Sequence, residues 1–210
     1  MTLYLALDTA TGRPTLALGT PADPGADIPL PGRRELSRDI ERLAAGLLGA
    51  RGARVQGLAG VVVADGPGSF TGLRIGIAFA KGVCRAVGVP LLAAPSLLGA
   101  ARAAAPDGAA ALVAFDALRG DVFRAAYRFG AGGVEVLLAP ELARAEDPEP
   151  PGIAVRAGEA AASAAALIRL IGVAGGAEAV ADPASWEPSY GRLAEAEARR
   201  LGRQAGERRP

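Results

Sequence analysis

A glycine-rich run at residues 65–76 constrains the fold of this chain more than any other feature, because a strand-like segment precedes it and a helix-like segment follows it. Residues 58–64 read LAGVVVA, which is typical of a buried strand, and helical spacing continues after the run to Val87. A strand, a tight bend and a helix N-terminus gather backbone N–H groups at a positive dipole end. Such a bend either binds a phosphate or lets another backbone segment approach closely.

The glycine spacing fits neither of the familiar nucleotide-binding fingerprints. A Walker loop ends in Gly-Lys-Ser/Thr, whereas Gly72, Leu73 and Arg74 occupy that place here. The dinucleotide fingerprint is G-x-G-x-x-G, but Gly66, Gly68 and Gly72 are spaced as G-x-G-x-x-x-G. Phosphate binding therefore stays open beside close backbone approach.

Small residues recur every four positions along the helix that follows the bend. They are Gly72, Gly76, Ala80, Cys84 and Gly88. A glycine inside a helix costs roughly 1 kcal/mol relative to alanine, so a row of them predicts that this face lies very close to another element. That element is either the amphipathic helix expected at residues 33–48 or a helix of a partner subunit.

Composition restricts the chemistry that this chain can perform. The sequence has 210 residues with no histidine and one cysteine, which excludes the common zinc sites, Ser-His-Asp triads and Cys-His pairs. No metal site is predicted. The net charge of +1 is too small for a surface that grips nucleic acid unaided.

Hydropathy and cysteine content indicate a cytoplasmic protein. Half of the residues are hydrophobic, but the apolar stretches are broken before they reach the ~20 residues of a membrane span. The first residues lack the basic region of a signal peptide, and a single cysteine allows no intrachain disulfide.

The order of predicted elements indicates an α/β protein with two lobes, residues 1–104 and 105–210. In the first lobe we expect strands at 3–8, 14–19, 58–64 and 89–94, a loop at 21–32, and helices at 33–48, after the bend and after a capping Ser96. In the second we expect strands at 110–116, 122–129, 134–138 and 153–157, a loop at 140–152, and helices at 160–171 and 188–203.

Four residues are candidates for binding a nucleotide, although the sequence assigns no cofactor. Asp8 and Thr9 end the first strand at a hairpin, and Gly68 and Ser69 lie in the bend. Asp8 is otherwise a turn cap. Ser69 and Thr71 are better interpreted as helix caps than as nucleophiles, because the chain has no histidine base.

Several segments together resemble the TsaB family, which is also called YeaZ. The run GPGSFTGLRIG at 66–76 is similar to the family signature, and LALDTAT at 5–11 is similar to its first strand. FDALRGDVF at 115–123 resembles the family's "DARRGEVY", and EPSY at 187–190 followed by Arg192 resembles "EPxYLR". The likeness covers nearly the whole chain in the same order.

The resemblance implies an actin/Hsp70/sugar-kinase-like (ASKHA) fold with two related lobes. It also implies a role in threonylcarbamoyladenosine modification of the tRNA adenosine beside the anticodon. In that pathway TsaC makes threonylcarbamoyl-adenylate, TsaD transfers the group and TsaE is a P-loop ATPase. TsaB is the non-catalytic partner that dimerises with TsaD and can pair with itself. tRNA would bind only through the complex, and ATP or ADP at the boundary with TsaD stays open.

The partner surface expected from this resemblance is the helix pair at 33–48 and 71–87. Its residues would be Leu36, Ile40, Leu43, Leu47, Gly72, Leu73, Gly76 and Ala80. Two positions depart from the family: Leu36-Ser37 replaces a common His-Ser, and Gly191 replaces the leucine of "YLR". Relatives that transfer the group hold their metal through paired histidines, which this sequence lacks.

Two other function classes remain alternatives. One is a sugar-kinase-like phosphotransferase that uses Asp8 and the bend at 66–72 with ATP. The other is a self-pairing scaffold with no role in nucleotide chemistry.

Overall fold

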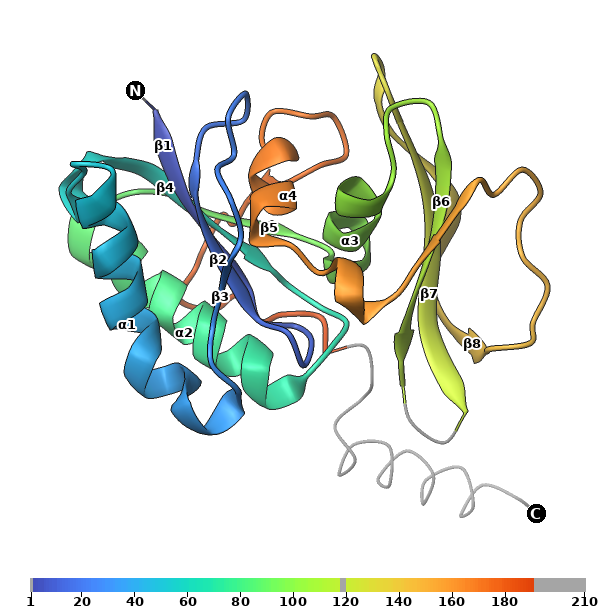
Figure 1. The fold of residues 1–210 in the computed structure, drawn as a ribbon, viewed down its shortest axis with the longest axis horizontal. Helices are drawn as coiled ribbons and strands as arrows, with labels where there is room; N and C mark the ends of the chain where they lie inside the picture. The colour runs from blue at the N-terminus through green and yellow to red at the C-terminus, as the bar shows by residue number, and fades with distance from the viewer. Residues whose placement is uncertain (1, 118–119, 191–210) are drawn as a thin grey trace.

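The computed structural model describes residues 2–117 and 120–190, which form two β-sheets with helices between and beside them (Figure 1). The strands are β1 (Leu3–Asp8), β2 (Thr15–Gly19), β3 (Ile28–Pro29), β4 (Leu58–Ala64), β5 (Leu91–Ala94), β6 (Ala110–Asp116), β7 (Asp121–Gly130), β8 (Gly133–Arg144), β9 (Val155–Ala157) and β10 (Glu178–Ala179). The α-helices are α1 (Arg33–Ala50), α2 (Phe70–Val87), α3 (Ser96–Ala104) and α4 (Ala164–Arg169). Short 3-10 turns lie at Val55–Gly57 and Glu159–Ala161.

The first sheet has six strands in the order β10-β5-β4-β1-β2-β3. β1, β4 and β5 run parallel, and β2 pairs antiparallel with β1 through the hairpin in which Asp8 faces Thr15. β4 is buried along almost its whole length, which explains its continuous apolar sequence. α1 and α2 cover one face of this sheet (Figure 1), and the side chains of Leu36 and Ile40 on α1 are buried.

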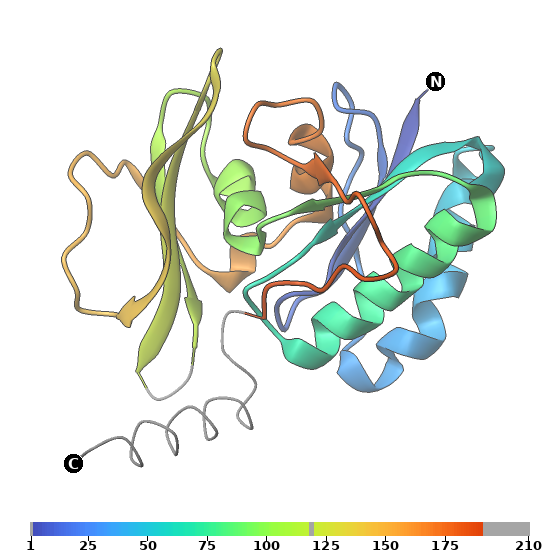
Figure 2. The same cartoon turned by 180° about the vertical axis from the view of Figure 1, so that it is seen from behind.

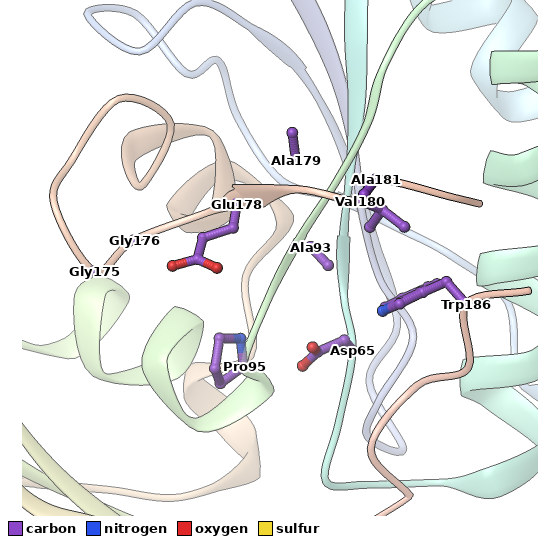
Figure 3. A pocket seen from close by; sticks show the side chains of 10 residues that line it. All are labelled: Asp65, Ala93, Pro95, Gly175, Gly176, Glu178, Ala179, Val180, Ala181 and Trp186. Carbon is purple, nitrogen blue, oxygen red and sulfur yellow. The ribbon is translucent and has the colours of Figure 1, made fainter.

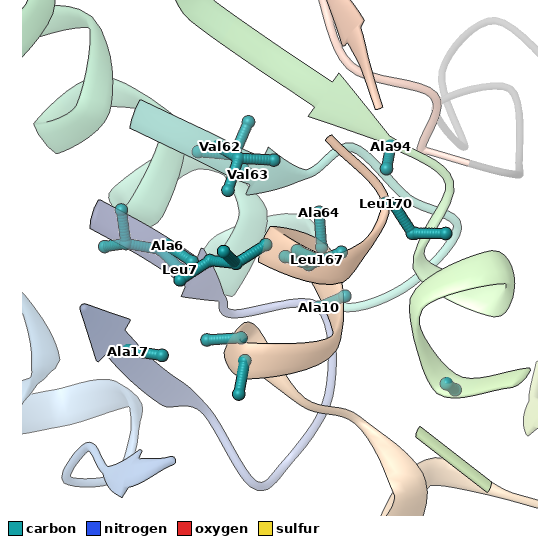
Figure 4. Close-up of a cluster of buried hydrophobic side chains, with 14 of the residues drawn as sticks. Ala6, Leu7, Ala10, Ala17, Val62, Val63, Ala64, Ala94, Leu167 and Leu170 are labelled. Carbon is teal, nitrogen blue, oxygen red and sulfur yellow. The ribbon is translucent and has the colours of Figure 1, made fainter. Parts of the chain in front are cut away.

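The second sheet has four strands in the order β8-β7-β6-β9. β6, β7 and β8 form an antiparallel meander, and β9 lies parallel to β6. α3 and α4 fill the space between the two sheets, as both views of the ribbon show (Figures 1 and 2). The apolar cluster in Figure 4 joins Ala6, Val62 and Leu167, which lie on β1, β4 and α4, so one core serves both sheets.

The second half of the chain returns to the first sheet. α4 packs on β1, β2 and β4, and β10 adds an antiparallel edge to β5 with Glu178 opposite Ala93. The expected division at residue 104 therefore separates the chain in sequence but only partly in space. The mixed α/β architecture with two sheets is the ASKHA-like fold that the sequence predicts.

Local differences from the expected elements have local causes. Ser96 does not cap α3; Pro95 is the N-cap, and the Ser96 Oγ accepts a hydrogen bond from the Gly66 N–H at 2.9 Å. A two-residue strand, β3, interrupts the expected loop at 21–32, and β8 extends into the expected loop at 140–152. The helix expected at 160–171 is reduced to a 3-10 turn and α4.

The remaining expectations concern the C-terminal part. Residues 188–190 are not helical, and the rest of the helix expected at 188–203 lies outside the described residues, as do Arg119 and Arg192. Within residues 2–117 and 120–190, no helix combines the length and apolarity that a membrane crossing requires.

Candidate functional site

The glycine-rich bend begins α2 through a side-chain cap. Ser69 is the N-cap residue, and its Oγ accepts a hydrogen bond from the Gly72 N–H at 3.2 Å. This confirms the interpretation of Ser69 as a cap, a contact that satisfies one of the unpaired donors of the first turn. At the other end, Gly88 adopts a left-handed conformation with φ 74° and is the C-cap. Gly88 therefore ends the helix and is not part of the packed row.

The bend lies directly against the turn between β1 and β2. The Ser69 N–H donates to the Ala10 carbonyl at 2.6 Å, and a Cβ added at Gly68 would lie 2.2 Å from the same oxygen. A Cβ added at Gly72 would lie 2.1 Å from the Thr9 carbonyl oxygen, and one at Gly76 would lie 2.3 Å from the Thr9 Oγ1. Close backbone approach therefore explains these glycines, and the element approached is the hairpin turn.

The same geometry disfavours a phosphate in the bend. An anion site needs N–H groups that point into open space. Here the N–H groups of Gly66, Ser69 and Gly72 donate to the Ser96 hydroxyl, the Ala10 carbonyl and the Ser69 hydroxyl. The carbonyl oxygens of Thr9 and Ala10 face the glycines, and such oxygens repel an anion.

Asp8 is placed at this contact but is closed off from solvent. Its exposed fraction is 0%, and that of Thr9 is 2%. The Asp8 Oδ1 accepts from the Ala10 N–H at 3.1 Å, whereas Oδ2 has no hydrogen-bond partner in the part of the chain that is described. Burial raises the pKa of this carboxyl to about 6, against the lowering effect of the Ala10 hydrogen bond. Of the four nucleotide candidates, Gly68 and Ser69 thus contact Ala10, which follows Asp8 and Thr9 in the hairpin turn.

Most of the residues expected at a partner surface are inside the molecule. Leu36, Ile40, Leu73 and Ala80 are at most 2% exposed, and Gly72 and Gly76 are also buried. Leu43 and Leu47 are half-buried on α1 and reach the surface. The buried six pack within the chain, because the apolar and small faces of both helices turn toward the sheet and its hairpin. Helical periodicity finds such a face without showing whether the neighbour is intrachain or intermolecular.

A second row of small residues lies on the outer side of α2. Ala78, Gly82 and Ala86 are exposed at the same four-residue spacing, and Ile75 and Phe79 beside them are half-buried. A Cβ added at Gly82 would meet nothing within 4 Å. α1, which packs beside α2, adds further exposed small residues, and Gly46 and Gly49 also have open space around them. We call these exposed residues (Gly46, Gly49, Ala78, Gly82 and Ala86) the outer face of the helix pair.

Comparison with known proteins identifies the relatives of this chain. The model of the family described as "TsaD: tRNA N6-adenosine threonylcarbamoyltransferase" matches residues 24–170. Among curated proteins, the chain is 32% identical over 146 residues to "tRNA threonylcarbamoyladenosine biosynthesis protein TsaB" of Escherichia coli K12, covering 66% of this chain and 63% of that protein. The chain belongs to the TsaD family, in its TsaB branch.

Other relatives agree with the TsaB branch. The Bacillus subtilis TsaB protein is 41% identical over 81 residues, which are 38% of this chain and 35% of that protein. The chain thus spans less than two thirds of the length of these curated TsaB proteins. The structure titled "YeaZ from Pseudomonas aeruginosa" aligns with TM-score 0.69 at 22% identity, over 82% of this chain and 91% of that chain, and shows the same fold.

A second solved structure confirms that the TsaB-type fold extends over nearly the whole chain. It is described as an uncharacterized protein similar to the peptidase YEAZ from Pseudomonas aeruginosa, and it aligns with TM-score 0.73 at 22% identity. The alignment covers 91% of this chain and 100% of that chain.

A C-terminal strap, residues 182–190, crosses α2 in this TsaB-branch chain and was not expected as a unit. Lys81 Nζ donates to the Trp186 carbonyl at 2.6 Å and lies 5.6 Å from the centre of its ring. The rings of Phe70 and Tyr190 are 4.7 Å apart. Trp186 and Tyr190 are thus packing anchors. Lys81 is the one lysine in the sequence, but nothing in the pattern indicated its partner.

No metal centre is formed by the residues that the structure covers. Within 2–117 and 120–190, no group of three or more His, Cys, Asp or Glu side chains is arranged to hold an ion.

Proposed function

We propose that this chain is a non-catalytic TsaB subunit that supports a TsaD transferase during threonylcarbamoyladenosine modification of tRNA. The observation that carries the proposal is the exposed row of small residues on α2 (Ala78, Gly82 and Ala86), with exposed Gly46 and Gly49 on the neighbouring α1, on a chain whose glycine-rich bend packs against its own hairpin turn. The curated relatives named TsaB are described as threonylcarbamoyladenosine biosynthesis proteins, which supplies the pathway.

The outer face has the physical properties of a helix-docking surface. A glycine in an exposed helix interior costs roughly 1 kcal/mol relative to alanine, and within the described part of the chain nothing lies within 4 Å of a Cβ added at Gly46 or Gly82. Small residues let two helix axes approach closely, as ridges of one helix enter grooves of the other. Leu43, Leu47 and Phe79 supply apolar area around this smooth centre. We therefore assign the contact with TsaD to this face.

The candidate nucleotide site supports a non-catalytic role. Asp8 is fully buried, and the Ser69 hydroxyl is engaged as a helix cap. No histidine is present in the sequence to serve as a general base. Nothing in the described geometry favours the phosphotransferase alternative.

The wider assembly follows as part of the same proposal. TsaE and tRNA join through TsaD, the isolated chain can pair with itself through the same outer face, and any ATP or ADP lies at the boundary with TsaD. A cytoplasmic location suits a subunit of a tRNA-modifying complex and its lone, buried thiol at Cys84.

The interface assignment is tested by Gly82→Leu, measured by calorimetric titration against TsaD. We expect at least about a hundredfold weaker binding, because a leucine side chain separates the helices at the centre of the contact. The variant should remain folded, since the new side chain enters open space. Gly130→Leu is the matched control, because Gly130 lies at the end of β7 with equally open surroundings. Wild-type affinity of Gly82→Leu would refute the interface.

The functional role is tested by reconstitution. TsaD, TsaE, tRNA, ATP and threonylcarbamoyl-adenylate are combined with and without this chain, and modified adenosine is measured by mass spectrometry. We expect product only when the chain is present. Full activity in its absence, or phosphotransfer by the isolated chain with ATP and magnesium, would contradict the proposal.

A further inference from the structure

A pocket of about 390 Å³ opens at the carboxyl ends of β4 and β5, beside β10 and the strap (Figure 3). Carboxyl ends of parallel strands are where open α/β sheets bind their ligands, and the volume lies within the range of small-molecule sites. The pocket adjoins the start of the glycine-rich run, because Asp65 lines it, and it includes no residue of the outer face of α1 and α2. The proposed function does not use it.

The pocket is acidic, with one aromatic wall. Its lining contains the carboxylates of Asp65 and Glu178 and the indole of Trp186, and among residues 2–117 and 120–190 no arginine or lysine side chain lines it. Figure 3 shows the carboxylates of Asp65 and Glu178 directed into the space between them. The edge of Trp186 lies on the side of Asp65 that is away from Glu178. Pro95 and the backbone around Gly176 close the remaining walls.

The Asp65 carboxylate is partly desolvated and unpaired. Among the described residues, no ion pair or hydrogen bond from another residue reaches it, and burial raises its pKa to about 6. Tyr127 is buried with an unpartnered hydroxyl, and the Asp65 charge adds to the burial that raises its pKa to about 12. Lys81 contacts Trp186 and donates to its carbonyl. Asp65 is half-buried and Glu178 is exposed, so a cation entering here would make a charge-assisted contact with a partly desolvated carboxylate and with a second carboxylate beside it.

We propose that this pocket binds an organic cation, a primary ammonium or guanidinium group held between Asp65 and Glu178 beside Trp186. A guanidinium presents several N–H donors to carboxylates in a fixed fork, and an ammonium presents three. Among the described residues no group of three or more acidic, His or Cys side chains is arranged to hold a metal ion, and this pocket supplies two carboxylates. An anion would be repelled. The group can belong to a free amine or to an arginine or lysine side chain of a protein.

The experiment uses agmatine, which carries both cationic groups, as the probe. Trp186 is the one tryptophan in the sequence, so intrinsic fluorescence reports on this pocket alone, and calorimetry provides a second measurement. We expect a saturable signal. Asp65→Asn and Glu178→Gln should each weaken binding at least about tenfold, because each leaves the ligand charge without one partner. Glu41→Gln, at an exposed acid on α1, is the matched control and should bind as the wild type does.

Two further ligands are used. One tests whether binding depends on the charge of the ligand or on its shape, and the other tests whether the cation belongs to a free amine or to a protein side chain. Butylurea keeps the planar fork without the charge and should not bind at the same concentrations. Tighter binding of agmatine than of N-acetyl-arginine methylamide indicates a free amine, whereas equal or tighter binding of the blocked arginine indicates a protein side chain. Failure of both cations in fluorescence and calorimetry, or unchanged binding in the Asp65→Asn/Glu178→Gln double variant, would overturn the proposal.

Discussion

The inner and outer faces of α2 have nearly the same composition and spacing but opposite surroundings. On the inner face, a Cβ at Gly76 would lie 2.3 Å from the Thr9 Oγ1, whereas on the outer face a Cβ at Gly82 would meet nothing within 4 Å. The inner glycines are therefore required by the fold of this chain. Among the described residues, no neighbour explains the outer glycine, and we have proposed that a partner does. A row of small residues thus predicts close approach without identifying the neighbour.

The surroundings of the inner glycines also decide between phosphate binding and close backbone approach as the reason for the glycine-rich bend. Its glycines admit the Thr9 and Ala10 backbone, and that contact fills the volume a phosphate would occupy. The hairpin turn and the first turn of α2 are consequently one structural unit. Changes on this inner side should act on stability, and changes on the outer side should act on association.

The largest effect on stability is expected for Gly76→Ala. The added methyl group overlaps the side chain of Thr9, which is 2% exposed and has little room to move. We expect a loss of about 2–3 kcal/mol in the free energy of unfolding, typical of overpacking a closed contact. Urea denaturation followed by circular dichroism measures this loss.

A second substitution shows whether the loss arises at this contact. Thr9→Ala removes Oγ1 and Cγ2, the two atoms that lie nearest to the new Cβ, so the double variant should recover a substantial part of the lost stability. If the two substitutions lower the free energy of unfolding in a strictly additive way, the contact between Gly76 and Thr9 is not the cause of the loss, and the inner glycine is not required there.

A smaller effect, also on the inner side, comes from the buried Asp8. Its folded-state pKa of about 6 lies above the ordinary value of 3.8, so between these values the folded state binds more protons than the unfolded state. This group therefore favours folding at low pH, and its contribution is lost as the pH rises through about 6. Relative to Asp8→Asn, the wild type should gain about 1 kcal/mol between pH 7 and pH 5.

The measurement for Asp8 is a pair of denaturant titrations at each pH, because the difference between the two proteins removes the contribution of other carboxyls. Parallel pH profiles for wild type and Asp8→Asn would show that this carboxyl is not shielded as described.

The smallest effect, of opposite sign, is expected on the outer face. Gly82→Ala adds a methyl group to open space in a helix interior, and it should raise the stability of the isolated chain by about 0.5–1 kcal/mol. Thermal unfolding beside Gly76→Ala gives the direct comparison of the two faces. Destabilisation by Gly82→Ala would mean that the outer glycine also serves packing within the chain.

Much of the fold could be predicted from local sequence. Strand-like runs such as residues 58–64, the amphipathic helix at 33–48 and the Ser69 cap depend on neighbours within a few positions. The packing of α4 and β10 on the first sheet could not be predicted. α4 has six residues and β10 has two, and elements this short show no hydrophobic periodicity that indicates which sheet they join. Asp65 and Glu178 likewise line one pocket only because β10 pairs with β5.

The sequence alone determined the α/β class, the glycine-rich bend after β4 and the TsaB resemblance, since all three depend on residue types at fixed short spacings. Only the tertiary structure decided which face of α2 the chain itself covers. It also decided that Asp8 is buried and that the Asp65 carboxylate lines an acidic pocket. These properties depend on contacts between segments far apart in the chain, and periodicity along one helix does not specify the surface that the helix meets.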